Sequence, residues 1–204
     1  KEIYPISNYG SAMSPFYSTL AIWVGAVVMA AMLKVTVADS TKKKLTNPKE
    51  HQLYIGRILL LIIIGFMQSA LICLGDLFFL GIQCKHPVMF VLTGMFTSFV
   101  YVNLIYALTV SFGDIGKAIA VVLMVMQVAG SGGTFPIQCA PKFFQVVYPL
   151  LPFTHSMNAM RECIAGFYGT TYATELGKLA IFLVPSLLLG LLLRKPIIRM
   201  NDAF

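Results

Sequence analysis

Runs of about 20 apolar residues recur along this chain of 204 residues, and a helix of that length spans the hydrocarbon core of a bilayer. The composition agrees with this pattern, because 58% of the residues are hydrophobic and only 11% are charged. A soluble domain carries about 25% charged residues. The sequence therefore predicts an all-α polytopic membrane protein and excludes a soluble fold.

Five segments are predicted to span the membrane as helices. The first is expected to begin at Ser14-Pro15, where a serine cap precedes a proline suited to the first helical turn. Residues 1–14 are interpreted as an extended connector from another domain, so the chain is expected to be one membrane domain at the C-terminal end of a longer protein. The last span is expected to tolerate Pro185 as a kink. The predicted spans cover residues 15–37, 55–80, 88–112, 115–129 and 175–193.

Basic residues set the expected orientation of the chain. A net charge of +7 would suggest nucleic acid as a partner of a soluble protein, but here the charge gathers in alternate loops and follows the positive-inside rule. We therefore expect no nucleic-acid partner. The expected location is the bacterial plasma membrane, with the start of the chain outside and its end in the cytoplasm. The residues that fix this orientation are Lys42, Lys43, Lys44, Lys49, Lys117, Arg194, Lys195 and Arg199.

Residues 130–168 are apolar but cannot form one continuous helix. Proline removes a backbone donor and clashes with the preceding turn, so each proline ends or kinks a helix. A broken apolar segment must be buried in protein or line a wet cavity, because its freed backbone groups cannot face lipid. We expect two short helices here, over residues 142–148 and 155–168, forming an outer re-entrant pair where function resides. The interrupting residues are Gly132, Gly133, Pro136, Pro141, Pro149 and Pro152.

Polar residues within the predicted spans carry separate expectations. Asp76 is either a functional intramembrane carboxylate or an interfacial residue, and we favour the interface. Trp23 fits an interfacial belt and protein packing equally well. Asn103 is expected to face the bundle, where it needs a partner. The turn before Lys117 lacks phosphate-loop spacing, so Asp114 is predicted to cap the next helix.

The main inner loop supports two interpretations. It is either a solvated basic loop against lipid headgroups or a contact for a partner protein, and residues after Asn47-Pro48 are candidates for a short interfacial helix. His51 by itself predicts no ligand site. The candidate partner-contact residues are Lys42, Lys43, Lys44, Lys49, Glu50 and His51.

No motif in the sequence predicts catalysis, a metal site or a cofactor. The sequence has no recognisable nucleophile–base grouping, no HExxH motif and no Walker motif, so no enzyme activity is expected. Four cysteines lack zinc-type spacing. Cys73 is predicted to be a small core residue, whereas a disulfide among Cys84, Cys139 and Cys163 and free thiols at those positions both remain open. Arg161-Glu162 and His155 are interpreted as residues satisfied by neighbouring groups.

Several stretches of the chain resemble one membrane-protein family. Residues 9–26, the turn at residues 112–118 with the sequence FGDIGKA, the GGTFP motif at residues 132–136 and LPFT at residues 151–154 are similar to the C-terminal membrane domain of the YhgE/Pip (phage infection protein) family. The resemblance covers nearly the whole chain and extends to the wider ABC-2 type transporter membrane fold. The motif residues of the re-entrant stretch are Gly132, Gly133, Thr134, Phe135, Pro136, Pro149, Pro152, Phe153 and Thr154.

This resemblance implies a further span and a large extracellular domain before Lys1. It also implies that the broken stretch matches the re-entrant helices of ABC-2 exporters, and that the basic loop occupies the place where such permeases contact an ATPase subunit. The first functional hypothesis is an export permease that lacks its own ATPase and forms a homodimer in the bilayer. The alternative is a membrane anchor or assembly subunit for an extracellular phage-receptor domain or a type VII secretion-accessory domain.

Overall fold

The structure, a computed structural model, describes residue 6 and residues 8–33 and 50–193. Those residues form helices and connecting turns, without any strand. The six longer helices are α1 (Tyr9–Met32), α3 (Glu50–Phe78), α4 (Pro87–Phe112), α5 (Asp114–Gly130), α7 (Pro152–Ala165) and α8 (Thr171–Ile181). The shorter ones are η1 (Ile137–Cys139), α6 (Lys142–Val147), η2 (Tyr148–Leu150), α9 (Leu183–Leu187) and η3 (Leu188–Leu193).

Four helical segments of the described chain are long and apolar enough to cross a membrane, which confirms an all-α polytopic membrane protein. They are Tyr9–Met32, Tyr54–Phe78, Pro87–Phe112 and Thr171–Gly190. Helix α5 has 17 residues, so it is about 25 Å long at 1.5 Å per residue, somewhat less than the hydrocarbon core. The fifth predicted span, residues 115–129, therefore stays a prediction.

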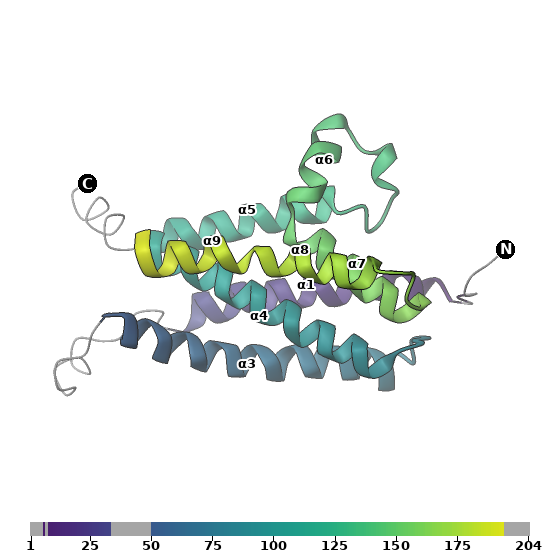
Figure 1. Cartoon of the computed structure of the whole chain (residues 1–204), viewed down its shortest axis with the longest axis horizontal. Helices are drawn as coiled ribbons and strands as arrows, with labels where there is room; N and C mark the ends of the chain where they lie inside the picture. Colours follow the sequence, from purple (N-terminus) through teal and green to yellow (C-terminus); the bar gives the residue numbers. More distant parts are fainter. Residues whose placement is uncertain (1–5, 7, 34–49, 194–204) are drawn as a thin grey trace.

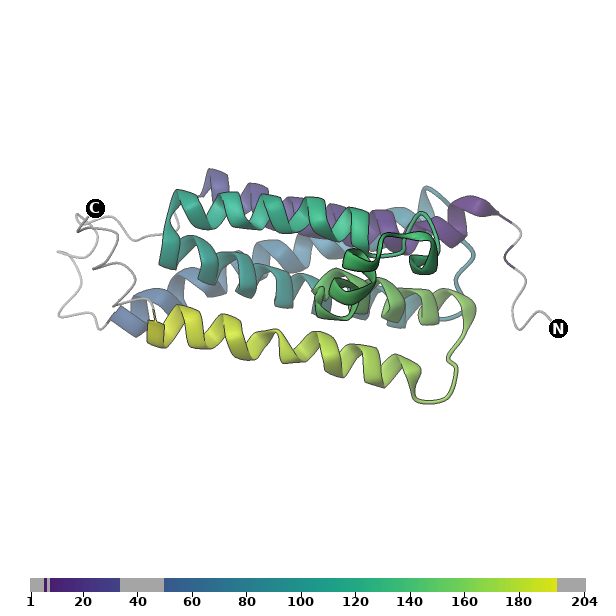
Figure 2. The same ribbon diagram turned by 90° about the horizontal axis from the view of Figure 1, so that it is seen from above.

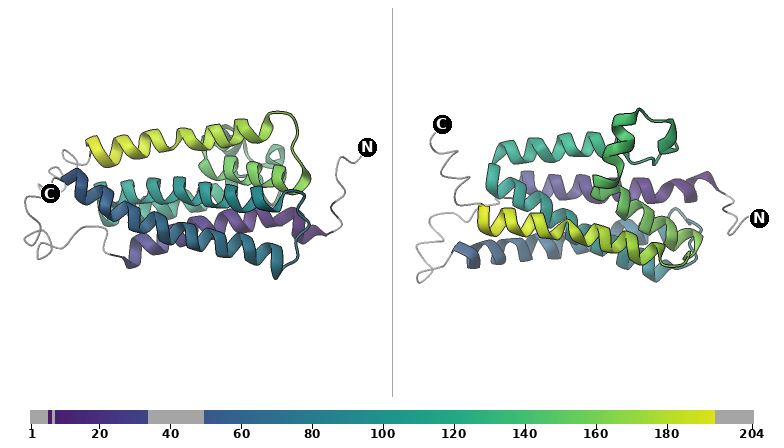
Figure 3. Two further views of the ribbon diagram at one scale, coloured as in Figure 1. Left: turned by 60° about the horizontal axis from the view of Figure 1, so that its bottom comes forward. Right: turned by 45° about the horizontal axis from the view of Figure 1, so that its top comes forward.

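The long helices lie side by side as an antiparallel bundle (Figure 1). The turn between α4 and α5, the start of α3 and the end of α9 lie at one end of it, and the start of α1 with the segment from α6 to α8 lies at the other (Figures 1 and 2). Figure 3 shows the loop from α7 to α8 at the same end as the start of α1. Helix α4 is the central element, packing against α1, α3, α5 and α7.

Aromatic residues form the centre of the core. Trp23 is fully buried, stacks edge-on against Tyr101 with ring centroids 4.7 Å apart, and donates its indole N–H to the Ala120 carbonyl at 3.2 Å. This settles the choice left open for Trp23 in favour of protein packing. Asn103 is buried as predicted, but its partner is the Phe99 carbonyl of its own helix, at 2.7 Å.

The predicted start of the first span is wrong. Helix α1 begins at Tyr9, so residues 9–14 are helical and not an extended connector. Pro15 lies inside the helix, where it cannot donate to the Ser11 carbonyl. The Ser14 hydroxyl donates to that carbonyl instead, at 3.2 Å, so Ser14 compensates for the proline and does not cap the helix.

Asp114 does not cap α5, contrary to the prediction. The capping position is Gly113, whose φ of 60° favours glycine, and Asp114 is the first helical residue. There it forms an ion pair with Lys117 at 2.9 Å, and this hydrogen bond lowers the pKa of the Asp114 carboxyl. A Cβ on Gly116 would lie 2.1 Å from the Leu108 carbonyl oxygen, so the close α4–α5 turn requires glycine there too.

Two other boundaries differ from the prediction. Glu50 and His51 start the continuous helix α3, so no separate interfacial helix forms at these two residues; Asn47 to Lys49 lie outside the described residues. The last span begins at Thr171, not at Glu175, and its α-helical geometry breaks at Phe182 between α8 and α9. Pro185 explains that break, because it cannot donate a hydrogen bond back along the helix.

Small residues also shape the contact between α1 and α3. The Gln68 side chain of α3 occupies the space above Gly25, where a Cβ would lie 1.5 Å from its amide nitrogen. That nitrogen donates to the Ala21 carbonyl at 3.2 Å. Nearer the end of α3, the Ser18 hydroxyl donates to the half-buried Asp76 carboxylate. Asp76 therefore ties α3 to α1, while its place relative to the membrane interface remains a prediction.

Candidate functional site

The broken stretch divides into an outer part and a buried part. After α5 the chain passes through η1, α6 and η2, which stand away from the bundle on the α5 side (Figure 1). It then re-enters the bundle as α7, which packs against α1, α4 and α8. Two short helices were predicted at residues 142–148 and 155–168. The first is nearly right, whereas the second starts earlier at Pro152 and ends at Ala165, because Gly166 has a φ of 109°.

The stretch was predicted to be buried in protein or to line a wet cavity, and its parts differ: most of α7 is buried, as are Gly130, Ser131, Gly133 and Leu151. Phe153, Met157 and Cys163 on α7 are fully buried, but η1, α6 and η2 contain no buried residue. Backbone groups of this part form hydrogen bonds within it. The Gln145 side-chain amide donates to the Ala140 carbonyl at 2.8 Å, and backbone N–H groups donate to carbonyls a few residues earlier in successive turns. The exposed apolar side chains of this part and of the turn before it are Phe135, Phe143, Val146 and Leu150.

The two glycines of the GGTFP motif have different structural roles. Gly132 has a φ of 63°, which turns the chain out of α5. Gly133 lies against the Phe16 ring of α1, and a Cβ added there would lie 2.1 Å from a ring carbon. Phe16 in turn stacks edge-on against Phe153 of α7, with centroids 5.6 Å apart. Glycine therefore allows the loop to pack directly on α1 and α7.

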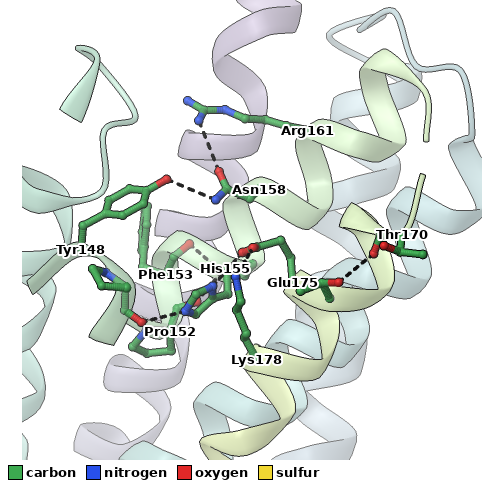
Figure 4. Close-up of polar contacts among 12 residues, drawn as sticks. Tyr148, Pro152, Phe153, His155, Asn158, Arg161, Thr170, Glu175 and Lys178 are labelled. Carbon is green, nitrogen blue, oxygen red and sulfur yellow. Dashed lines mark hydrogen bonds and ion pairs between the residues drawn. The ribbon is translucent and has the colours of Figure 1, made fainter. Parts of the chain in front are cut away.

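Arg161 anchors this loop to α7. Its guanidinium donates to the carbonyls of Gly132 and Gly133 at 3.3 and 3.5 Å, and to the Asn158 amide oxygen at 3.5 Å. The Asn158 amide donates to the Tyr148 hydroxyl at 3.2 Å, as Figure 4 shows. Partial burial lowers the pKa of Arg161, so these carbonyls replace hydration that the charge has lost.

The other predicted motif residues lie along the same path. Pro149 and Pro152 bracket the turn from η2 into α7, and Pro152 occupies the first turn of α7, where a missing N–H costs nothing. Phe153 and Thr154 are fully buried on α7. Thr134, Phe135 and Pro136 help to line a cavity of about 290 Å³, together with Ala129, Gly132, Ile137, Cys139 and Ala140.

His155 connects the broken stretch to the last predicted span. Its Nε2 lies 2.9 Å from the Pro149 carbonyl oxygen, and its Nδ1 lies 2.7 Å from a carboxylate oxygen of Glu175 on α8 (Figure 4). The other oxygen of Glu175 accepts from Lys178 at 2.8 Å. The prediction of a hydrogen-bonded structural histidine fits these contacts. The sequence reasoning missed Glu175, although an acid at the start of an apolar span was a usable signal.

Within the described chain the four cysteines are free thiols, which is one of the two alternatives left open by the sequence. The Cys84 thiol donates to the Cys163 carbonyl at 3.5 Å, and burial raises the pKa of Cys84. Cys139 is exposed on η1, and Cys73 is buried as expected. Glu162 accepts from the Tyr168 N–H at 2.8 Å, so Arg161 and Glu162 are satisfied separately, as predicted.

The predicted partner loop is largely beyond what the structure describes. Lys42, Lys43, Lys44 and Lys49 lie outside the described residues. Glu50 and His51 form the first turn of α3, at the end of the bundle opposite the broken stretch (Figure 1). The described residues contain no cluster of three or more histidine, cysteine or acidic side chains able to hold a metal ion.

Comparison with known proteins identifies the class. The model of the ABC-2 family transporter proteins matches residues 2–192, nearly the whole length of the chain, so this chain belongs to that family and is a transporter-type, multi-pass membrane domain. It is 27% identical over 164 residues to the uncharacterized protein YhgE of Bacillus subtilis (strain 168), which supports a YhgE/Pip-type membrane domain. That match covers 80% of this chain and 20% of the relative, so the chain spans about a fifth of the relative's length. No solved structure matches this chain.

Proposed function

We propose that this chain is the membrane half of an export permease that dimerises and is driven by a separate ATPase subunit. The family match over residues 2–192 carries the proposal. The segment from α5 to α7 also supports it. Arg161 and Gly133 hold this loop against α1 and α7, so one end of the bundle carries a folded element that is not a membrane-spanning helix. The bacterial plasma membrane is the proposed location, with the broken stretch at the outer face.

The basic segment between α1 and α3 is the proposed ATPase contact. Under the positive-inside rule its lysines face the cytoplasm, where an ATPase would lie. Glu50 and His51, which start α3, place the end of this segment on the side of the bundle opposite the broken stretch. A contact at that end transmits movement along α3, which packs on α1 and α4.

The exposed apolar residues of η1, α6, η2 and the turn before them favour a hydrophobic environment. Phe135, Phe143, Val146 and Leu150 are each at least 60% exposed. Exposing one of these side chains to water instead of burying it costs about 1.5–3 kcal/mol of free energy. We therefore place η1, α6 and η2 in the outer leaflet or against the second copy of a dimer.

The test is purification of the full-length protein from native membranes, followed by an ATPase assay. Copurifying ATPase activity that is lost when Lys42, Lys43, Lys44 and Lys49 are replaced by Ala supports the permease. Lys117→Ala is the matched control, since it removes one basic residue from a different loop on the same predicted side. A clean preparation without ATPase activity contradicts the proposal.

A second function is favoured by one specific observation. The chain matches only 20% of the length of its YhgE relative, so that relative carries extensive sequence beyond the matched region. We propose as the alternative that the domain anchors an extracellular part acting in phage reception or in type VII secretion. Deleting that part alone while retaining this domain distinguishes the two: lost phage binding or secretion with no ATPase partner favours the anchor.

A further inference from the structure

The imidazole of His155 is enclosed by two hydrogen-bond acceptors. The Pro149 carbonyl oxygen, 2.9 Å from Nε2, has no proton to give, so Nε2 must be the donor. The Glu175 carboxyl oxygen lies 2.7 Å from Nδ1. If His155 were neutral and Glu175 ionised, lone pairs of Nδ1 and the carboxylate would face each other at that distance.

A second proton is therefore required between His155 and Glu175. It resides either on Nδ1, giving an imidazolium beside a carboxylate, or on Glu175, giving a carboxylic acid that donates to a neutral imidazole. Lys178 donates to the other oxygen of Glu175 at 2.8 Å, which favours the carboxylate and hence the imidazolium. In both arrangements the pair holds one exchangeable proton.

The pair is shielded from water, and Lys178 is a titratable group in direct contact with it. The side chains of His155 and Glu175 are 6% and 11% exposed, whereas Lys178 is 46% exposed and is the third charged member of the cluster. The Tyr101 hydroxyl of α4 is hydrogen-bonded to the Ser156 hydroxyl of α7, and the Tyr148 hydroxyl of η2 accepts from the Asn158 amide of α7. Where α1 packs against α7, the Thr19 hydroxyl donates to the Met160 sulfur. On α8 the Tyr172 hydroxyl is hydrogen-bonded to the Thr93 hydroxyl of α4 at 2.9 Å.

The position of this pair gives its proton a structural consequence. Pro149 belongs to η2, His155 to α7 and Glu175 to α8, which begins the last apolar segment. These are the three elements that connect the outer part of the broken stretch to that segment. Loss of the proton leaves the imidazole with one N–H for two acceptors, so either the Pro149 contact or the Glu175 contact loses its hydrogen bond inside a buried junction.

We propose that His155 and Glu175 form a proton-binding site that couples proton occupancy to the contact between the broken stretch and the last span. With the proton bound, α7 and α8 are held together through Nδ1 and the carboxyl group. With the proton released, one of the two contacts of His155 is lost and the junction of η2, α7 and α8 opens. This inference is independent of the ATPase proposal, because it concerns only residues of this chain.

The test uses the full-length protein in lipid nanodiscs. Amide hydrogen exchange across residues 149–178 is measured by mass spectrometry at several pH values at which the protein stays folded, and is normalised to an unfolded reference peptide. Protection is expected to fall by at least about tenfold as the proton leaves, because removing one partner of a buried charge pair costs more than a tenfold equilibrium change. Nitrogen NMR of ¹⁵N-histidine-labelled protein, assigned by the signal lost in His155→Gln, is expected to show the ring changing from two protonated nitrogens to one as protection falls.

Glu175→Gln separates this proposal from a simple structural role. The Gln amide donates to Nδ1 of a neutral imidazole, so the contact no longer needs the extra proton. This variant is expected to keep protection at every pH and to lose the pH dependence. Asp114→Asn, an exposed carboxylate at the other end of the bundle, is the matched control and is expected to leave the wild-type profile unchanged.

Three results overturn the proposal. The first is wild-type protection that does not vary with pH, and the second is a Glu175→Gln variant with the wild-type pH profile. The third is a set of His155 ring-nitrogen signals that does not change with pH. None of these measurements involves ATPase activity, so a failure here is distinct from a failure of the permease proposal.

Discussion

Gly133→Ala is the most direct test of how the loop after α5 packs. The added Cβ would lie 2.1, 2.8 and 2.9 Å from three ring carbons of Phe16, well inside ordinary carbon–carbon contact. Phe16 is 4% exposed and stacks on Phe153, so the ring has little room to move. The loop or the ring must therefore shift by on the order of 1.5 Å to restore contacts of 3.5–4.0 Å.

Overpacking of this kind costs about 1–3 kcal/mol of folding free energy. For a domain of this size each kcal/mol shifts the thermal midpoint by roughly 2–4 °C, so the expected loss is about 2–12 °C. The measurement is thermal unfolding of the purified protein in detergent, followed by size-exclusion chromatography. Gly177→Ala is the matched control, because its Cβ meets nothing within 4 Å, and it is expected to be neutral or stabilising.

A double-mutant cycle with Phe16→Leu isolates the contact. The smaller side chain relieves the clash, so the double variant is expected to be more stable than the sum of the single effects by about 0.5–3 kcal/mol. Two results would refute the reasoning. One is a Gly133→Ala protein as stable as Gly177→Ala, and the other is strict additivity in the cycle.

Four further predictions follow from the sequence and the structure. A cysteine placed at Lys43 is expected to react only with reagents added from the cytoplasmic side, and labelling from outside contradicts the topology. Gly116→Ala is expected to destabilise more than Gly133→Ala in the same melting assay, because its Cβ meets the rigid Leu108 backbone at 2.1 Å and not a side chain; an equal or smaller loss argues against that ranking. Arg161→Gln is expected to raise protease cleavage of residues 131–141 several-fold, since a hydrogen bond to a charged group contributes about 1.5–3 kcal/mol; unchanged cleavage would show that the loop does not depend on this anchor. Pro136→Ala is expected to reduce transport with the spans still inserted, and unchanged transport would make the broken stretch a connector.

Sequence patterns predicted the elements whose character is local. Apolar runs predicted apolar helices because the thickness of the bilayer fixes the length of a span, and helix α4 runs from Pro87 to Phe112 where a span over residues 88–112 was predicted; its placement in the membrane stays a prediction. The prolines and glycines predicted where the helix breaks, because they change the allowed backbone conformations and hydrogen bonds whatever residues surround them. The same local reasoning failed at Ser14-Pro15 and Asp114, where a cap-like pattern lies inside a helix or one residue into it.

Tertiary structure alone decided which residues meet. No spacing in the sequence indicates that Gly133 packs on Phe16, that Trp23 donates to Ala120, or that Arg161 holds the loop carbonyls. His155 and Glu175 lie 20 residues apart and meet because a positive φ at Gly166 ends α7 and α8 then packs back alongside it. Local sequence determines where a helix can form and where it must break. The pairing of side chains depends on how the helices pack, and that is fixed by the whole bundle at once.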